Sequence, residues 1–151
     1  TFYSSFKLYV YDNNYLYFLS VIFICITTDI GGYVFGKIFK GPKLTKISPK
    51  KTYSGMIGGF ILSILLASVY LHYTLIEFQI IPDKKIIFIF LVSLVSQIGD
   101  IIISYFKRLS NIKDTGKIIP GHGGLLDRVD GMIFAFPFSY LILEFKIFQI
   151  L

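Results

Sequence analysis

The residues from Ile86 to Phe106 read IIFIFLVSLVSQIGDIIISYF, a run that is apolar apart from a few spaced polar side chains. A helix needs roughly 20 such residues to cross about 30 Å of hydrocarbon. The chain of 151 residues is 54% hydrophobic. Its mean hydropathy of +0.70 indicates a membrane protein rather than a soluble domain. Three further apolar runs have a similar length: Tyr15 to Phe35, Met56 to Ile76 and Gly131 to Leu151. These runs predict an all-α polytopic membrane protein with about four transmembrane helices.

The cationic side chains are concentrated in two segments, 36–53 and 107–130. Of the chain's 15 lysines and arginines, six lie in the first segment and five in the second. Because two predicted spans separate the segments, both lie on the same side of the membrane, and the positive-inside rule makes that side cytoplasmic. The net charge of +6 therefore belongs to one membrane face, where it suits anionic lipid and nucleotide phosphates. The positive charge therefore does not indicate a nucleic-acid-binding surface. The lone cysteine, Cys25, excludes an intrachain disulfide.

Polar residues recur along the run that begins at Ile86 and directly after it: Ser96, Asp100, Ser104 and Lys107. Their spacing of four, four and three residues places them on one face of a helix. Such a stripe lines a cavity or forms a hydrogen-bonded seam with another helix. The carboxylate of Asp100 favours the cavity, because a seam needs hydroxyls but no charge in the membrane.

A second carboxylate, Asp29, lies within the first apolar run. A charged side chain in a span costs about 2.5–3.5 kcal/mol on insertion scales, so it usually faces a partner or a water-filled cavity. The alternative is that Asp29 lies near the cytoplasmic end of its helix and is simply solvated. Nearby Gly31, Gly32 and Gly36 are small enough to let two helices pack closely.

Between the last two apolar runs, the stretch from Ser104 to Asp130 combines five cations, three carboxylates, a histidine and four glycines. This mixture suits a site for a metal-bound phosphate, since carboxylates hold the metal, cations meet the phosphate, and glycines admit the backbone. Asp100 and Asp127 together would offer oxygen ligands to Mg²⁺, whereas Asp130 has the alternative of stabilising a helix N-terminus. His122 is a candidate general base or a phosphate hydrogen-bonding group.

The same stretch resembles the signature of phosphatidate cytidylyltransferases, also called CDP-diacylglycerol synthases. The matching positions are Ser104, Lys107, Arg108, Lys113, Asp114, Gly116, Pro120, Gly121, His122, Gly123, Gly124, Asp127, Arg128 and Asp130. Further blocks match at Thr28-Asp29, Gly36-Lys37, Ile47 to Thr52 and Ser96 to Asp100. Without the resemblance, the lysine-rich loop from Lys43 to Gly55 would indicate only the cytoplasmic side of the membrane. The resemblance runs from about residue 27 to residue 140, the C-terminal half of the family's usual length, so the chain is expected to be an N-terminally truncated catalytic domain spanning 1–151.

The resemblance implies an integral membrane enzyme that transfers the cytidylyl group of CTP to phosphatidic acid, giving CDP-diacylglycerol and pyrophosphate. It implies Mg²⁺ as cofactor, a homodimer, and an active site facing the cytoplasm from a bacterial inner membrane or, in a eukaryote, the ER or another organelle membrane. The implied metal ligands are Asp100 and Asp127, with Asp29, Asp114 and Asp130 in support. The implied catalytic residues are these two aspartates with Lys107, Arg108, Arg128 and His122. The implied phosphate and substrate contacts are Lys50, Lys51, Ser104, Lys113, Gly121, Gly123 and Gly124.

Three positions depart from the family pattern. Tyr53-Ser54-Gly55 replaces Trp-Glu-Gly, Ile103 replaces a Glu, and Gly131 replaces a Ser. Two other functions remain as alternatives: a CTP-dependent polyprenol or lipid kinase, which moves the γ-phosphate, and an inactive truncated membrane subunit. The Gly-His-Gly-Gly-x-x-Asp-Arg-x-Asp block favours the cytidylyltransferase over the kinase.

Overall fold

The computed structural model describes residues 1–10, 15–45, 48, 51–74, 82–110, 112 and 129–145. These residues form five named helices and one isolated antiparallel bridge, between Lys43 and Thr52. The helices are α1 (Phe2–Val10), α2 (Leu16–Phe39), α3 (Tyr53–Thr74), α4 (Pro82–Leu109) and α6 (Met132–Glu144). The fold is therefore that of an all-α polytopic membrane protein, as predicted.

Three of these helices are long and apolar enough to cross a membrane, namely α2, α3 and α4. They correspond to the first three predicted runs with shifted ends: α2 continues four residues beyond Phe35, α3 begins three residues before Met56, and α4 begins four residues before Ile86. The last two residues of the second run, 75 and 76, lie outside the described part. The fourth run gives α6, which is apolar but only 13 residues long. Residues 146–151 lie outside the described part, so a fourth full span stays a prediction.

The end of α2 follows from its sequence. Lys40 adopts a left-handed conformation with φ of 42°, and its N–H donates to the carbonyl of Gly36. Gly41 and Pro42 come next. Proline disfavours the helical conformation in the residue before it, so the helix must stop by Gly41. The chain then turns back toward α3.

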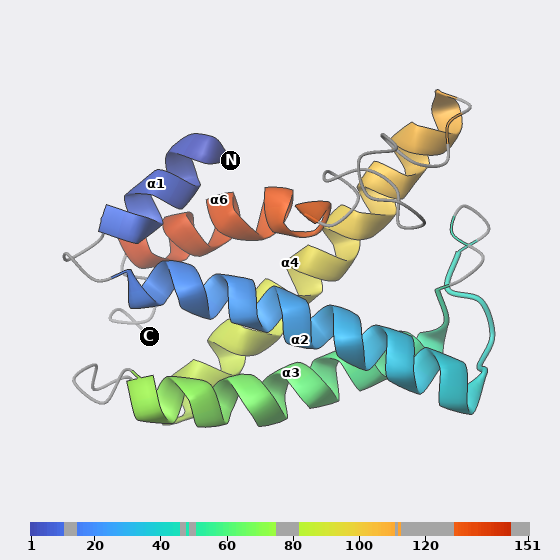
Figure 1. Cartoon of the computed structure of the whole chain (residues 1–151), viewed down its shortest axis with the longest axis horizontal. Coiled ribbons are helices and arrows are strands. Elements are labelled where there is room, and N and C mark those ends of the chain that lie inside the picture. Colours follow the sequence, from blue (N-terminus) through green and yellow to red (C-terminus); the bar gives the residue numbers. More distant parts are fainter. Residues whose placement is uncertain are drawn as a thin grey trace, which may run out of the picture.

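The helices run alternately up and down, so that the end of α2, the start of α3 and the end of α4 all lie toward one end of the bundle (Figure 1). The end of α4 diverges there from the α2–α3 pair, and α6 begins beside the middle of α4. At the other end, α1 packs on α6 and α2. The described residues 36–45, 51–53 and 107–110 thus lie toward one end, which agrees with the prediction, and the side of the membrane stays a prediction. We call this end the basic end.

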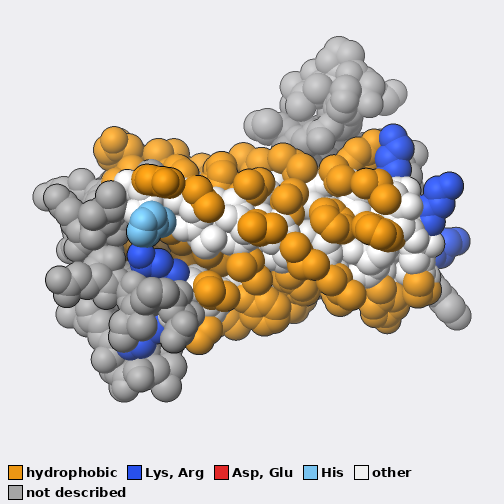
Figure 2. Space-filling model, turned by 90° about the horizontal axis from the view of Figure 1, so that it is seen from below, with side chains coloured by type: hydrophobic (Ala, Val, Ile, Leu, Met, Phe, Trp, Pro, Cys, Tyr) orange, Lys and Arg blue, Asp and Glu red, His pale blue; other side chains and the backbone are white. Residues whose placement is uncertain are grey.

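The outward face of α3 shows how the bundle meets lipid. Exposed side chains recur at every fourth position, with a tyrosine at each end of the series: Tyr53, Ile57, Ile61, Leu65, Val69 and Tyr73. Twenty residues of helix span about 30 Å, which matches the hydrocarbon thickness, and tyrosines favour the two membrane interfaces. Figure 2 shows the corresponding face as a broad hydrophobic band with Lys and Arg side chains only toward its ends. The level of Tyr53 therefore marks the membrane interface at the basic end.

Helices α2 and α3 pack through glycines in the half of the bundle near the basic end. A Cβ atom placed on Gly31 would lie 2.6 Å from the carbonyl oxygen of Gly58 and 2.9 Å from the Cα of Gly59. A Cβ on Gly55 would lie 2.6 Å from the carbonyl oxygen of Gly32. The two backbones approach this closely only because no side chain separates them.

This packing predicts different tolerance at two adjacent glycines. We expect Gly31→Ala to destabilise the protein by about 1–3 kcal/mol, since its new methyl group meets backbone that cannot move aside. Gly32→Ala is the control, because its nearest neighbour would be the carbonyl oxygen of Gly55 at 3.7 Å, an ordinary contact. Thermal unfolding in detergent measures both. Equal effects of the two substitutions on stability would contradict the close glycine packing of α2 against α3.

The apolar core occupies the other half of the bundle. It comprises buried side chains from the first half of α2, the second half of α3, the first half of α4, and α6, among them Val21, Ile24, Leu71, Ile89 and Ala135. Toward the basic end the buried interior becomes polar, and Thr28 of α2 donates a hydrogen bond to Ser93 of α4 at 2.8 Å. The core fixes the helices, and this polar half is where a site can form.

Candidate functional site

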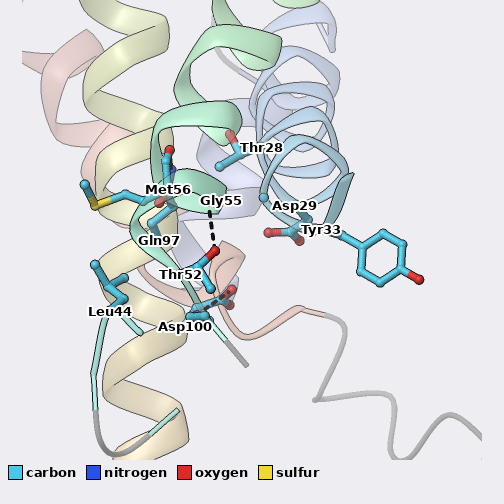
Figure 3. Close-up of a pocket in the computed structure, with 11 residues that line it drawn as sticks. Thr28, Asp29, Tyr33, Leu44, Thr52, Gly55, Met56, Gln97 and Asp100 are labelled. Atoms are coloured by element: carbon cyan, nitrogen blue, oxygen red, sulfur yellow. Dashed lines mark hydrogen bonds and ion pairs between the residues drawn. The ribbon is translucent and has the colours of Figure 1, made fainter. Parts of the chain in front are cut away.

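A pocket of about 250 Å³ lies where α2, α3 and α4 converge at the basic end. Figure 3 shows its walls: α2 and α4 face each other across it, and the start of α3 closes one side. The lining combines charged, polar and apolar side chains: Thr28, Asp29, Gly32, Tyr33, Leu44, Lys51, Thr52, Gly55, Met56, Gln97 and Asp100.

The loop between α2 and α3 folds back to bring Lys51 into this pocket. The N–H of Leu44 donates to the carbonyl of Lys51 at 2.8 Å, and the N–H of Tyr53 donates to the carbonyl of Pro42 at 3.1 Å. Thr52 then caps α3, its hydroxyl accepting a hydrogen bond from the N–H of Gly55 at 3.1 Å. These contacts hold the backbone on both sides of Lys51, so the position from which its side chain extends is fixed.

Lys51 and two aspartates form the charged part of the pocket. The Lys51 ammonium lies 3.1 Å from Oδ2 of Asp100 in a partly exposed ion pair. The carboxylate of Asp29 is directed from α2 into the pocket on the side of Thr52 and Asp100, whereas the ring of Tyr33 points outward (Figure 3). Asp29 lines this cavity together with a cation and a second carboxylate, and its side chain is exposed, so both alternatives for Asp29 stay open.

The polar stripe of α4 faces inward along its length. Ser96 is buried, Gln97 donates to the carbonyl of Met56 at 3.3 Å, and Asp100 reaches the pocket. One turn beyond, Ser104 is half-buried. Lys107 forms an ion pair with Asp130, at the start of α6. The stripe thus combines the two predicted alternatives. It lines a cavity at Asp100, and on either side of Asp100 it forms polar contacts with neighbouring segments.

The start of α6 lies directly against Asp100. A Cβ atom on Gly131 would collide with the hydroxyl of Ser96, and it would lie 2.8 Å from the carbonyl oxygen of Ser96 and 3.1 Å from Oδ1 of Asp100. Gly131, which stands where the family pattern has a serine, is therefore required by this packing. It lets the backbone of segment 129–131 approach the carboxylate.

From the tyrosine levels of α3, we infer that the pocket lies near the membrane interface. Tyr53 marks the interface on α3, and Thr52 and Gly55 on either side of it line the pocket. Lys51 precedes this level in the loop. Asp29 lies deeper, because it precedes Gly36 in α2 by about two turns, and the neighbour of Gly36 is Gly55.

Several residues singled out by the sequence lie outside the described part of the chain. Among the described ones, Arg108 is exposed near the end of α4, and Asp130 is buried in its pair with Lys107. No group of three or more His, Cys, Asp or Glu able to hold a metal occurs among the residues that are described. The predictions for the following residues stay predictions: Lys50, Lys113, Asp114, Gly121, His122, Gly123, Gly124, Asp127 and Arg128.

Sequence reasoning did not assign a pocket role to Tyr33, Leu44, Met56 or Gln97. A signal existed for Gln97, which adjoins the polar stripe, and its amide now bridges α4 to α3. The apolar members of this set carry no such signal, because in an apolar chain nothing distinguishes a pocket wall from a lipid-facing side chain.

Comparison with known proteins agrees with this geometry. Residues 2–146 match the model of a family described as the cytidylyltransferase family. A phosphatidate cytidylyltransferase of Rickettsia bellii is 44% identical over 139 residues, covering 82% of this chain and 57% of the relative. One from Bacillus subtilis is 36% identical over 140 residues, covering 88% of this chain and 48% of the relative.

A third relative, the phosphatidate cytidylyltransferase of Rickettsia typhi, is 45% identical over 124 residues, or 78% of this chain and 54% of the relative. The chain spans about half the length of the curated relatives it matches. The family model, in contrast, covers nearly all of this chain, including the pocket, the polar stripe and the loop that carries Lys51. The chain therefore belongs to the cytidylyltransferase family.

Proposed function

We propose that this protein transfers the cytidylyl group of CTP to phosphatidic acid, giving CDP-diacylglycerol and pyrophosphate. The observation that carries the proposal is the pocket at the membrane interface in which Lys51 meets Asp100 beside Asp29. An ammonium and carboxylates suit a reaction between two phosphates assisted by a cation. The interfacial depth suits one lipid substrate and one substrate dissolved in water.

In this reaction a phosphate oxygen of phosphatidic acid attacks the α-phosphorus of CTP. A new P–O bond forms, the bond between the α-phosphorus and the bridging oxygen breaks, and pyrophosphate leaves with the electron pair. The residues contribute mainly by holding two anions in line and by offsetting their repulsion. In this pocket Lys51 supplies positive charge, while Thr52 and Gln97 supply polar groups in its walls.

Asp100 fits a role as a ligand for Mg²⁺. Its Oδ2 atom already holds the Lys51 ammonium, so the carboxylate is aimed at a position that a cation can occupy. Mg²⁺ is bound in proteins through one or two carboxylates with water and substrate phosphates, which agrees with a site of few protein ligands. Asp127 is the proposed second ligand and Asp29 a supporting charge. When bound, Mg²⁺ would offset negative charge on the phosphates.

We place the basic end in the cytoplasm, since both lysine-rich segments meet there and CTP is a cytoplasmic nucleotide. The bacterial relatives make a bacterial inner membrane the proposed location. Assembly as a homodimer belongs to the same proposal.

Labelled CTP tests the assignment directly. Membranes containing the protein are incubated with phosphatidic acid, Mg²⁺ and CTP labelled at either the α- or the γ-phosphate. We expect the α-label to enter the lipid fraction and the γ-label to remain in water as pyrophosphate. Transfer of the γ-label to lipid would establish a kinase instead, and failure of both labels to reach lipid would leave an inactive subunit.

A further inference from the structure

The contact between Lys51 and Asp100 joins two groups that the proposed function uses separately. Lys51 is a candidate phosphate contact and Asp100 a candidate metal ligand, yet the Nζ and Oδ2 atoms lie 3.1 Å apart. The side chains are 30% and 25% exposed, so the pair borders the open volume of the pocket. The ammonium and a divalent cation are consequently alternatives at the same carboxylate oxygen.

The charges around the pair favour such an exchange. Among the described lining residues, the two carboxylates of Asp29 and Asp100 face a single ammonium, that of Lys51. A divalent cation carries twice the charge of an ammonium, so it matches the charge of two carboxylates, whereas an ammonium matches only one. An ion pair that remains partly exposed contributes at most about 1 kcal/mol, so separating it costs little.

The pocket also provides room and a second destination for the ammonium. Its volume of about 250 Å³ corresponds to roughly eight water molecules, enough for a partly hydrated cation beside a phosphate group. The backbone of Lys51 is held by the loop contacts with Leu44 and Ser48, whose carbonyl accepts from the N–H of Lys51 at 3.0 Å. Only the flexible side chain has to move.

We propose that Lys51 is a built-in counter-cation of Asp100 that a divalent cation displaces, and that the released ammonium then binds a phosphate oxyanion. Cation binding and phosphate binding are thereby coupled, because each cation that takes Asp100 creates a free positive charge for the anion beside it. The inference rests on the proposed function for the identity of the two ligands. It adds a mechanism by which the site accepts a cation and an anion together.

Binding of Mn²⁺ alone, followed by electron paramagnetic resonance of the purified full chain in detergent, tests the first half. Lys51→Met removes the ammonium and keeps an unbranched side chain. We expect it to tighten Mn²⁺ binding about three- to six-fold. This factor corresponds to the free energy of a partly exposed ion pair, which no longer competes with the cation. Lys51→Arg should stay within about two-fold of the wild type, because the competing charge is kept.

Lys43→Met is the matched control, since Lys43 lies in the same loop, is exposed and does not line the pocket. It should leave the Mn²⁺ affinity unchanged, which separates local competition from a general loss of charge. Asp100→Asn should remove the binding in either background. Unchanged or weaker Mn²⁺ binding in Lys51→Met, or equal tightening in Lys43→Met, overturns the proposal.

Lysine acetylation measured by mass spectrometry tests the second half. We expect the reactivity of Lys51 to rise several-fold when saturating Mn²⁺ is added, and to fall again when pyrophosphate is added with Mn²⁺ in excess. Lys43 should change little throughout. A Lys51 reactivity that does not respond to Mn²⁺ contradicts the exchange, and one that pyrophosphate does not lower contradicts the anion step.

These outcomes are independent of the labelled-CTP assay. If cytidylyl transfer occurs but Lys51→Met does not alter Mn²⁺ affinity, the exchange is wrong and the function stands. If the binding and reactivity changes occur while the α-label never reaches lipid, the exchange stands and the proposed function fails.

Discussion

Asp100→Asn is expected to reduce the proposed cytidylyl transfer by at least about 100-fold while the helical bundle stays folded. The substitution replaces a charged oxygen by a neutral amide at the carboxylate that holds the Lys51 ammonium and is proposed to hold Mg²⁺. Loss of one such electrostatic contact typically costs two to three orders of magnitude in rate. The side chains have nearly the same shape, so the contact with Gly131 is kept. Transfer of the α-label from CTP measures the loss, and circular dichroism measures the fold.

Glu144→Gln provides the control for this substitution, because Glu144 is an exposed acid at the far end of α6 from the pocket. It loses the same charge and should retain full transfer. Activity above about a tenth of the wild type in Asp100→Asn would remove Asp100 from the proposed catalytic role. A parallel loss in Glu144→Gln would point to a general effect of charge on the membrane protein.

Lys107→Met is expected to destabilise the protein by about 3 kcal/mol. The side chains of Lys107 and Asp130 are 11% and 10% exposed, so their ion pair is almost wholly buried between α4 and the start of α6. Removing one partner of a buried pair leaves a poorly compensated charge, which typically costs 3–5 kcal/mol. The pair also holds the start of α6 beside Asp100, so its loss should loosen the site. Thermal unfolding in detergent measures the effect.

Arg108→Met is the matched control for Lys107→Met, since Arg108 is the next residue of α4 and is exposed. Its loss should change stability by less than about 0.5 kcal/mol. The double substitution Lys107→Met with Asp130→Asn should recover part of the lost stability, because the buried charge is removed together with its partner. A stable Lys107→Met protein that fails only in transfer would instead identify Lys107 as a phosphate contact, the role indicated by the sequence.

The sequence by itself determined the class of fold and the end of the bundle toward which the pocket lies. Apolar runs of spanning length leave the helix as the only element that satisfies the backbone in lipid, and the uneven distribution of lysines placed two segments together. The spacing of Ser96, Asp100 and Lys107 located the inward face of α4 for the same local reason, since side-chain direction follows from helical periodicity. Helix ends were displaced by a few residues, because apolar content does not mark where capping by Thr52 or the left-handed Lys40 stops a helix.

Only the tertiary structure decided which charges become partners. Nothing in the order of residues pairs Lys51 with Asp100 or Lys107 with Asp130, which lie 49 and 23 positions apart. Those pairings depend on how closely the helices approach, and the approach depends on glycines: Gly31 against α3 and Gly131 against Asp100. Periodicity tells which way a side chain points from its own helix. The distance to the next helix is set by packing, and that distance turns four separate charged residues into two ion pairs, one of which lines the pocket.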